Sequence, residues 1–206
     1  AFFEERQKSK HNNLSVNTSR GCPYNCNFCS VTKFNGRKYR RRTNDSVMNE
    51  LENLANIRWK PNHIFFSDDN FAAKKQETIE LLNRLKNSKF ARSGYSCQLS
   101  VNSTFSSLKD NSIDEEFIRL LKDAGFSAVF LGIESMNEQT LRSYNKPASV
   151  EKNDLAVKTF KNFGLWVHGM MIVGGDGDTN DSLDEDLEWA KQNIDSVQFF
   201  APIPLP

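Results

Sequence analysis

Three of the four cysteines, Cys22, Cys26 and Cys29, lie within eight positions of one another in the pattern C-x3-C-x2-C. Three thiolates on so short a loop can each bind one iron atom of a cubane [4Fe–4S] cluster. The fourth iron is then left without a protein ligand, so another molecule can bind there. The spacing therefore predicts an iron–sulfur cluster with one open, reactive iron.

Two other interpretations of the same cysteines remain open. A structural zinc site would need a fourth Cys or His, and the candidates are Cys97, far along the chain, and His11. A thioredoxin-like redox pair of Cys26 and Cys29 would leave Cys22 without a role. Cys97 is expected to be a small buried apolar side chain rather than a ligand.

The elements that must position this loop follow a regular alternation. Apolar, strand-like runs occur at residues 14–18, 63–67, 95–101, 128–133, 166–173 and 196–200. Between them, apolar residues recur at helical spacing. One such stripe is Val47, Leu51, Leu54 and Ile57, and another is Leu183, Leu187, Ala190 and Ile194. Alternating strands and helices predict right-handed βαβ units and a parallel sheet, either open or curled into a barrel.

Helix ends are predicted from local patterns. Residues 112–115 and 182–185 each begin with Ser and carry Glu three positions later, which is the pattern of a capping box at a helix start. Gly125 and Gly164 each stand just before a strand-like run, where a helix is expected to end.

Polar residues follow most of the predicted strands. In parallel sheets, active-site residues gather beyond the carboxyl ends of the strands. Here those ends carry residues 18–20, 68–70, 102–103, 134–135 and 174–176, and the cysteine loop directly follows the first of them. The sequence therefore predicts one site at this edge of the sheet.

The cysteine loop, with Phe28 before its last cysteine, resembles that of the radical S-adenosylmethionine (SAM) enzymes. Further segments resemble, in the same order, the signatures of one branch of these enzymes: residues 36–42, 65–71, 131–135 with 145–146, and 172–179. In that branch a cobalamin-binding domain usually precedes the radical domain. Its activities include methylation and ring formation at unreactive carbons.

The resemblance implies an α/β fold, a partial (β/α)6 TIM-like barrel spanning residues 14–206, with residues 1–13 as a flank cut from a longer parent. It implies a [4Fe–4S] cluster on Cys22, Cys26 and Cys29, with SAM bound at the free iron and cleaved reductively to a 5′-deoxyadenosyl radical. It also implies an electron donor such as ferredoxin or flavodoxin, and cobalamin bound by a domain that this chain lacks. The substrate, whether small molecule, lipid or peptide, is left open.

Candidate SAM contacts come from the strand ends. Asp68, Asp69 and Asn70 could accept hydrogen bonds from the methionyl ammonium, or could cap a helix that begins near Ala72. Glu134 ends a strongly apolar run. We expect it to bind the ribose hydroxyls or the methionyl amine, with Ser135 beside it, rather than to cap the segment that follows.

Four further positions complete the expected cofactor contacts. Gln98 and Ser100 share one face of the third predicted strand, which in a small barrel is the cavity wall, unless they face the covering helices instead. Gly174, paired with Gly175, would let the backbone approach the adenine, or would simply make a turn. Phe28 belongs to the cysteine loop itself. His168, within a strand run, is expected to be a hydrogen-bonded structural residue.

Composition limits the remaining functions. The chain has 27 basic and 26 acidic residues and a net charge of +1, which does not favour a broad nucleic-acid surface. The basic run 37–42 is therefore expected to be solvated or paired. No apolar run approaches the ~20 residues of a membrane span. Few cysteines and no signal-like start predict a cytoplasmic protein.

The rival functions are a cobalamin-independent radical enzyme, such as a methylthiotransferase-like protein, and a non-catalytic iron–sulfur or zinc protein.

Overall fold

The computed structural model describes residues 13–55, 63–88 and 94–203. Six strands form one sheet in the order β1-β4-β5-β8-β9-β10. Their bounds are β1 Asn13–Val16, β4 His63–Phe66, β5 Gly94–Ser100, β8 Phe126–Glu134, β9 Trp166–Ile172 and β10 Ser196–Phe200. Every neighbouring pair is parallel, and β1 and β10 are the two edges. All six predicted strands and their parallel arrangement are confirmed.

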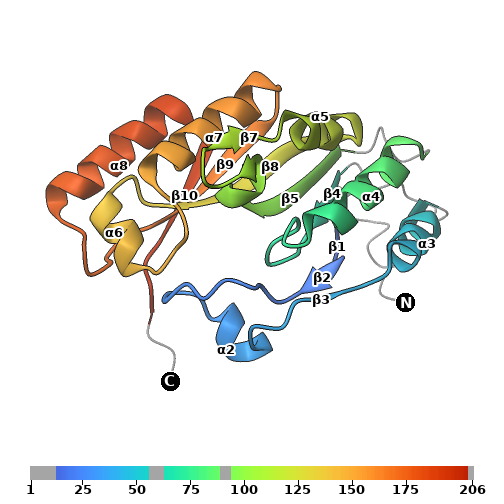
Figure 1. Ribbon diagram of the computed structural model, residues 1–206, viewed down its shortest axis with the longest axis horizontal. Coiled ribbons are helices and arrows are strands. Elements are labelled where there is room, and N and C mark those ends of the chain that lie inside the picture. Colours follow the sequence, from blue (N-terminus) through green and yellow to red (C-terminus); the bar gives the residue numbers. More distant parts are fainter. Residues whose placement is uncertain (1–12, 56–62, 89–93, 204–206) are drawn as a thin grey trace.

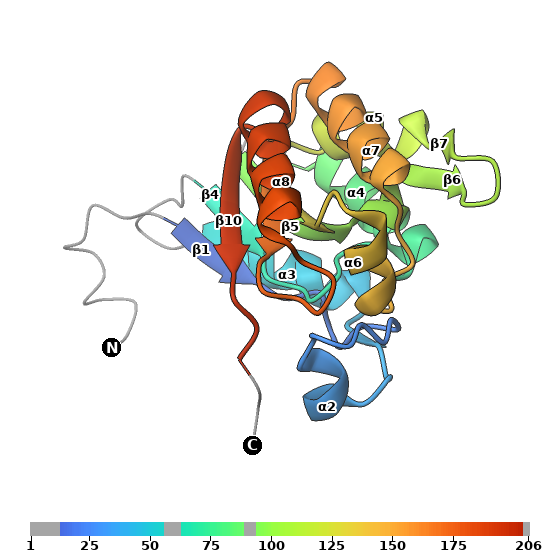
Figure 2. The same cartoon turned by 90° about the vertical axis from the view of Figure 1, so that its left-hand side faces the viewer.

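The larger helices form an outer layer over the sheet (Figure 1). They are α3 Asn44–Ala55, α4 Lys75–Lys86, α5 Glu115–Asp123, α6 Glu138–Ser143, α7 Val150–Asn162 and α8 Asn180–Asn193. Shorter elements are β2 Ser19–Arg20, α2 Val31–Asn35, β3 Arg40–Arg41, η2 Val101–Thr104, β6 Phe105–Ser107 and β7 Ser112–Ile113. In Figure 2 the arrowhead of β10 points toward the side of the molecule where α2 lies, so the carboxyl ends of the strands face the cysteine segment.

The two faces of the sheet differ as the period of a strand requires. On the face covered by helices, Val16, Phe66 and Val129 are buried and belong to one core cluster, together with leucines of α3 and α4. On the opposite face, Phe130 packs against Phe65 and His168, with ring centroids 5.2 and 4.7 Å away. The helix-covered face of the sheet is thus apolar, and the opposite face, the inner wall, carries aromatic and polar side chains.

Both histidines of the described residues are hydrogen-bonded on this inner wall. His63 Nε2 lies 2.7 Å from Ser96 Oγ, and His168 Nδ1 lies 2.8 Å from Ser196 Oγ. Partial burial lowers the pKa of both imidazoles. His168 is therefore a satisfied structural histidine, as its position in a strand predicts.

The observed starts of α5 and α8 differ from the predicted capping boxes, whereas the predicted helix ends at Gly125 and Gly164 are confirmed. The box predicted at residues 112–115 is wrong, because Ser112 lies in β7 and Asp114 caps α5 by accepting from the Phe117 amide at 3.0 Å. The box predicted at residues 182–185 is also wrong: Thr179 and Ser182 form the reciprocal cap of α8, one turn earlier. Gly125 (φ 101°) and Gly164 (φ 70°) follow α5 and α7 in the left-handed conformation expected there.

The apolar stripes are confirmed in part. Val47 and Leu51 of α3 are buried, while Ile57 lies outside the described residues. Ala190 of α8 and Ile194, which directly follows this helix, are buried, but Leu187 of α8 is 38% exposed, because the neighbouring Asp186 takes the buried position. Among the described residues, no helix is long and apolar enough to span a bilayer.

Candidate metal and cofactor site

The three clustered cysteines line one cavity of about 120 Å3 at the carboxyl ends of β5 and β8. Cys22, Cys26 and Cys29 are all partly exposed, and none of them forms a disulfide. The strand ends supply the rest of the lining: Asp69, Asn70, Gln98, Leu99, Ser100, Gly132, Glu134 and Met170, together with Tyr24, Phe28 and Lys146. The structure therefore brings the cysteine loop and the ends of several strands into a single site.

Contacts at both ends hold the cysteine loop in place. Gly21 has φ +89°, and a Cβ there would lie 2.2 Å from the Lys38 carbonyl oxygen, so only glycine fits this approach of two backbones. The Gly21 amide donates to Asp69 Oδ2 at 2.7 Å. Farther along, the Asn27 amide donates to the Tyr144 carbonyl at 2.9 Å, and the Phe28 and Tyr144 rings meet edge to face.

Burial disfavours the charged form of each thiol. It raises the pKa of Cys22 and Cys29, and raises the pKa of Cys26 to about 11 despite the opposing effect of the Lys146 ammonium. A bound metal would overcome this effect, because a coordinated thiol is deprotonated outright.

The donor set fits a [4Fe–4S] cluster. Three cysteine sulfurs border the cavity, and thiolate is the ligand that iron–sulfur clusters take. Within the described residues, no three His, Cys, Asp or Glu side chains converge as they would around a single ion. A cubane does not require such convergence, because each thiolate binds a different iron atom.

Cys97 stands apart from the other cysteines. It is fully buried in the core cluster on β5, opposite Phe66 and Val129 in the sheet, and burial raises its pKa well above the usual range. Cys22 borders the same cavity as Cys26 and Cys29, which favours a site of three cysteines over a redox pair of two. The second zinc-ligand candidate, His11, lies outside the described residues.

Glu134 is aimed into the cavity by an irregular strand end. The register of β8 against β9 shifts between Gly132 and Glu134, which redirects a side chain. Glu134 has φ +66°, a conformation that costs a non-glycine residue ~1–3 kcal/mol and that recurs at functional sites. Asn137, not Glu134, caps the next helix, α6, by accepting from the Gln139 and Thr140 amides.

Lys146 forms a buried ion pair with Glu134. Its Nζ lies 2.5 Å from Glu134 Oε1, with 7% of the lysine side chain and 11% of the glutamate side chain exposed. Lys146 Nζ also donates to the Gly132 carbonyl. A Cβ at position 132 would lie 2.7 Å from Glu134 Oε1 and 3.0 Å from Lys146 Nζ, so Gly132 provides the room for this pair.

Most predicted cofactor contacts line this cavity. Gln98 and Ser100 face it rather than the covering helices, and Asp69, Asn70 and Phe28 border it as well. The Asn70 side chain also lowers the pKa of the Cys22 thiol, against the larger increase that burial causes. The alternative role of residues 68–70 as a helix cap is wrong, because α4 begins only at Lys75, after a turn.

Three predicted contacts do not line the cavity. Asp68 is buried and its carboxylate is occupied by Thr18 and Ser19. Ser135 is buried and donates to Asp186 Oδ2 at 3.0 Å, toward α8. Gly174 is exposed and begins a turn in which Asp178 Oδ2 accepts from the Gly174 and Gly175 amides at 2.8 and 2.9 Å. The structure therefore favours the turn at this glycine pair.

Asp68 fastens the end of β4 to the start of the cysteine segment, so we expect its loss to reduce stability. Replacing it by alanine leaves the Thr18 and Ser19 donors buried without an acceptor and should lower the free energy of unfolding by about 2–4 kcal/mol. Urea denaturation measures this. Asp176→Ala, at an exposed loop position, is the matched control and should change stability by less than about 0.5 kcal/mol. If Asp68→Ala and Asp176→Ala lowered the free energy of unfolding equally, Asp68 would not hold the end of β4 to the cysteine segment.

Lys146 is the charged residue of the site to which the sequence assigned no role. It stands 12 positions after Glu134, beyond α6, so helical or strand periodicity does not connect the two residues. The only signal was its place in a short motif with Asn145. Asn145 has φ +51°, and its side chain donates to the Asn25 carbonyl at 2.9 Å, which ties this segment to the cysteine loop.

Comparisons with known proteins agree on one family. The sequence profile of the radical SAM superfamily matches residues 16–190. An uncharacterized methyltransferase of Pyrococcus horikoshii is 32% identical over 93% of this chain and 39% of its own length. The hopanoid C-2 methylase of Rhodopseudomonas palustris is 28% identical over 93% of this chain and 35% of its own.

A solved structure shows the same fold. It is the radical SAM methyltransferase TsrM from Kitasatospora setae, with cobalamin and a [4Fe–4S] cluster bound; the TM-score is 0.78 at 21% identity, over 93% of this chain and 34% of that one. The chain thus spans less than two fifths of the length of these relatives.

Proposed function

Since the chain belongs to the radical SAM superfamily, a superfamily of enzymes, we propose that it holds a [4Fe–4S] cluster and cleaves SAM as the radical domain of a cobalamin-dependent methyltransferase. The observation that carries this proposal is the shared cavity of Cys22, Cys26 and Cys29 with the Glu134–Lys146 pair. When bound, the cluster supplies the electron that breaks the C5′–S bond of SAM, giving methionine and a 5′-deoxyadenosyl radical.

The remaining cavity groups match the charges of SAM. The methionyl end of SAM carries an ammonium and a carboxylate, and the cavity offers the Glu134 carboxylate and the Lys146 ammonium side by side. Charged partners make shorter and stronger hydrogen bonds than neutral ones. Gln98 and Ser100, from the inner wall, supply neutral donors and acceptors for the ribose or the adenine.

The role of each residue follows from this placement. The cysteines fix the metal, Glu134 and Lys146 orient the methionyl end, and the partly buried cavity limits access of water to a radical that would abstract hydrogen from most molecules. Asp69 does not need to contact the ligand, because its carboxylate already fixes the Gly21 amide and so the entry to the cysteine loop.

Methyl transfer is the part of the proposal that rests on the relatives. Two of them are named as methyltransferases or methylases, and the TsrM structure contains cobalamin. We propose the same cofactor for the whole protein to which this domain belongs. An electron donor such as flavodoxin or ferredoxin would supply the reducing electron.

Anaerobic reconstitution tests the proposal. Electron paramagnetic resonance of the reduced cluster should change when SAM is added, because SAM binds the open iron. With dithionite as reductant we expect slow release of 5′-deoxyadenosine, and no methyl transfer when methylcobalamin is supplied, because we propose that another part of the protein binds cobalamin.

The outcomes separate the rival functions. An intact cluster with no spectral response to SAM and no 5′-deoxyadenosine would indicate a purely structural metal site. Tight binding of methylcobalamin to this chain would contradict the assignment of cobalamin to another part of the protein.

A further inference from the structure

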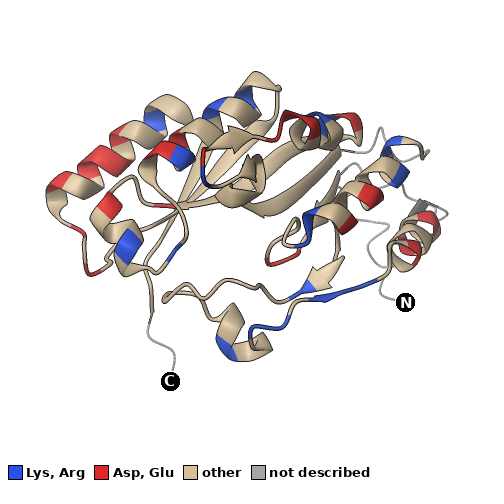
Figure 3. Cartoon of the chain, viewed as in Figure 1, with Lys and Arg blue, Asp and Glu red and all other residues tan. Residues whose placement is uncertain are grey.

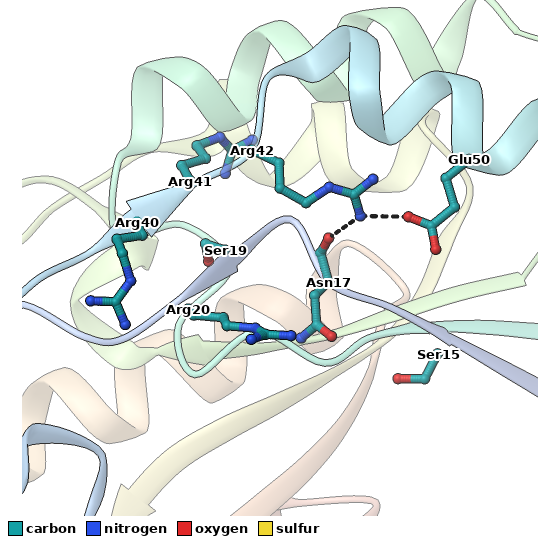
Figure 4. A pocket seen from close by; sticks show the side chains of 8 residues that line it. All are labelled: Ser15, Asn17, Ser19, Arg20, Arg40, Arg41, Arg42 and Glu50. Carbon is teal, nitrogen blue, oxygen red and sulfur yellow. Dashed lines mark hydrogen bonds and ion pairs between the residues drawn. The ribbon is translucent and has the colours of Figure 1, made fainter. Parts of the chain in front are cut away.

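A larger cavity, of about 450 Å3, lies beside β1, an edge strand of the described sheet, and shares no lining residue with the cysteine cavity. The inner side of β1, the β2–β3 ribbon and α3 surround it. Its lining residues are Ser15, Asn17, Ser19, Arg20, Arg40, Arg41, Arg42 and Glu50 (Figure 4). Four arginines and one carboxylate thus border one hollow in a chain whose net charge is only +1.

Two of the four arginines are neutralised within the fold. Arg42 Nη1 lies 2.5 Å from Glu50 Oε2 and also donates to the Asn17 carbonyl at 2.9 Å. Arg41, whose side chain is 3% exposed, lies 3.4 Å from Glu77 Oε2 and hydrogen-bonds Thr18 and Thr78. The basic run is therefore partly paired, as its sequence context predicts.

Arg20 and Arg40 keep their charge uncompensated. Neither forms an ion pair within residues 13–55, 63–88 and 94–203, and over the same residues the Arg20 side chain makes no hydrogen bond. Arg40 donates at 3.0 Å to Oδ1 and at 3.5 Å to the carbonyl of Asn35, a neutral residue. Asn35 thus orients the guanidinium without neutralising it.

The ribbon places these two residues directly opposite each other. Arg20 and Arg40 are cross-strand partners in the antiparallel β2–β3 pair, and in Figure 4 the Arg20 side chain extends toward Asn17 while that of Arg40 extends in another direction. Like charges placed directly opposite on two strands are destabilising. The ribbon cannot move apart easily, because Gly21 abuts the Lys38 carbonyl and the Arg42 amide donates to the Thr18 carbonyl at 2.8 Å.

We propose that this cavity binds a phosphate-type oxyanion through Arg20 and Arg40. A dianion in this cavity would offset the repulsion between the two arginines with charge-assisted contacts, and the planar fork of arginine suits tetrahedral oxyanions. The volume lies within the roughly 300–1,000 Å3 of small-molecule sites. Figure 3 shows basic residues along the β3 segment, whereas acidic residues gather on α8.

Calorimetric titration of the full chain, without iron, tests this site with orthophosphate, pyrophosphate and adenosine 5′-monophosphate. We expect saturable binding with one site per chain. The double variant Arg20→Gln/Arg40→Gln should weaken it roughly ten- to hundredfold, the range for lost charged hydrogen bonds. The matched control is Arg37→Gln/Lys38→Gln, two exposed basic residues of the same segment that do not line the cavity, and it should bind as the wild type does.

The ranking of the probes identifies the source of the anion. Tighter binding of the nucleotide than of orthophosphate assigns the site to a phosphorylated organic molecule, and equal affinity assigns it to the free anion. Equal weakening of phosphate binding in the two double variants would overturn the proposal. So would tight binding of a DNA oligonucleotide that is equal in the two double variants, because it would indicate diffuse attraction by the basic segment.

A charge reversal separates binding from folding. Arg40→Glu places a carboxylate opposite Arg20, so it should raise the melting temperature of the free protein while abolishing phosphate binding. If Arg40 had a purely structural role, Arg40→Glu would lower the melting temperature as well as phosphate binding. Saturable phosphate binding that survives in Arg40→Glu would also overturn the proposal.

Discussion

Replacing Cys22, Cys26 or Cys29 by alanine should leave the reconstituted protein colourless and nearly free of iron. All three sulfurs border the same cavity, and a cubane with an open fourth iron has no protein ligand to spare. Loss of one thiolate therefore removes the cluster rather than weakening one bond. Iron and sulfide analysis together with the visible absorbance of each anaerobically reconstituted variant measures this.

Cys97→Ala is the matched control. Cys97 is buried in the core on β5 and has no access to the cavity, so this variant should keep iron content and colour. It should lose only about 1 kcal/mol of stability, as a small truncation in a core does. Equal loss of iron from Cys97→Ala would indicate a four-cysteine site and contradict an open iron.

The parts of the fold that the sequence predicts are those governed by local periodicity. Strands buried on one face read as apolar runs, and all six were found within one or two residues of their observed ends. The rule that active-site residues gather beyond the carboxyl ends of parallel strands then placed the cysteine loop, Asp69 and Glu134 together, because parallel strands end at the same edge.

The direction of a side chain at a strand end was harder to predict. Asp68 and Asp69 are adjacent, yet Asp69 borders the cavity and Asp68 binds Thr18, 50 positions earlier. Ser135 turns to Asp186, 51 positions later. Such choices depend on buried donors and acceptors that tertiary structure brings together, and no local pattern encodes them.

The Glu134–Lys146 pair is the clearest case of a site feature that required the structure. The sequence indicates Glu134 but not its irregular strand end, its left-handed backbone or its lysine partner. Because the pair is buried, removing Glu134 alone would both leave a lysine uncompensated and remove a candidate SAM ligand. A single substitution therefore cannot separate stability from binding.

A double-mutant cycle separates the two effects. Glu134→Gln and Lys146→Met should each lower the free energy of unfolding by about 3 kcal/mol or more, because each leaves one buried charge unpaired. The double variant should regain most of that loss, remaining within about 1–2 kcal/mol of the wild type, since a neutral pair carries no unpaired charge. Urea denaturation of the four proteins gives the coupling.

SAM binding should not recover along with stability. Each single variant should keep its iron yet bind SAM more weakly by about 1.5–3 kcal/mol, the range for a hydrogen bond to a charged group. The double variant should bind at least as weakly as either single variant, because it lacks both groups that match the methionyl end. Equilibrium binding of SAM to the reconstituted proteins measures this. If the double variant regained SAM affinity together with stability, the pair would serve only to hold the end of β8, and SAM would contact other residues of the cavity.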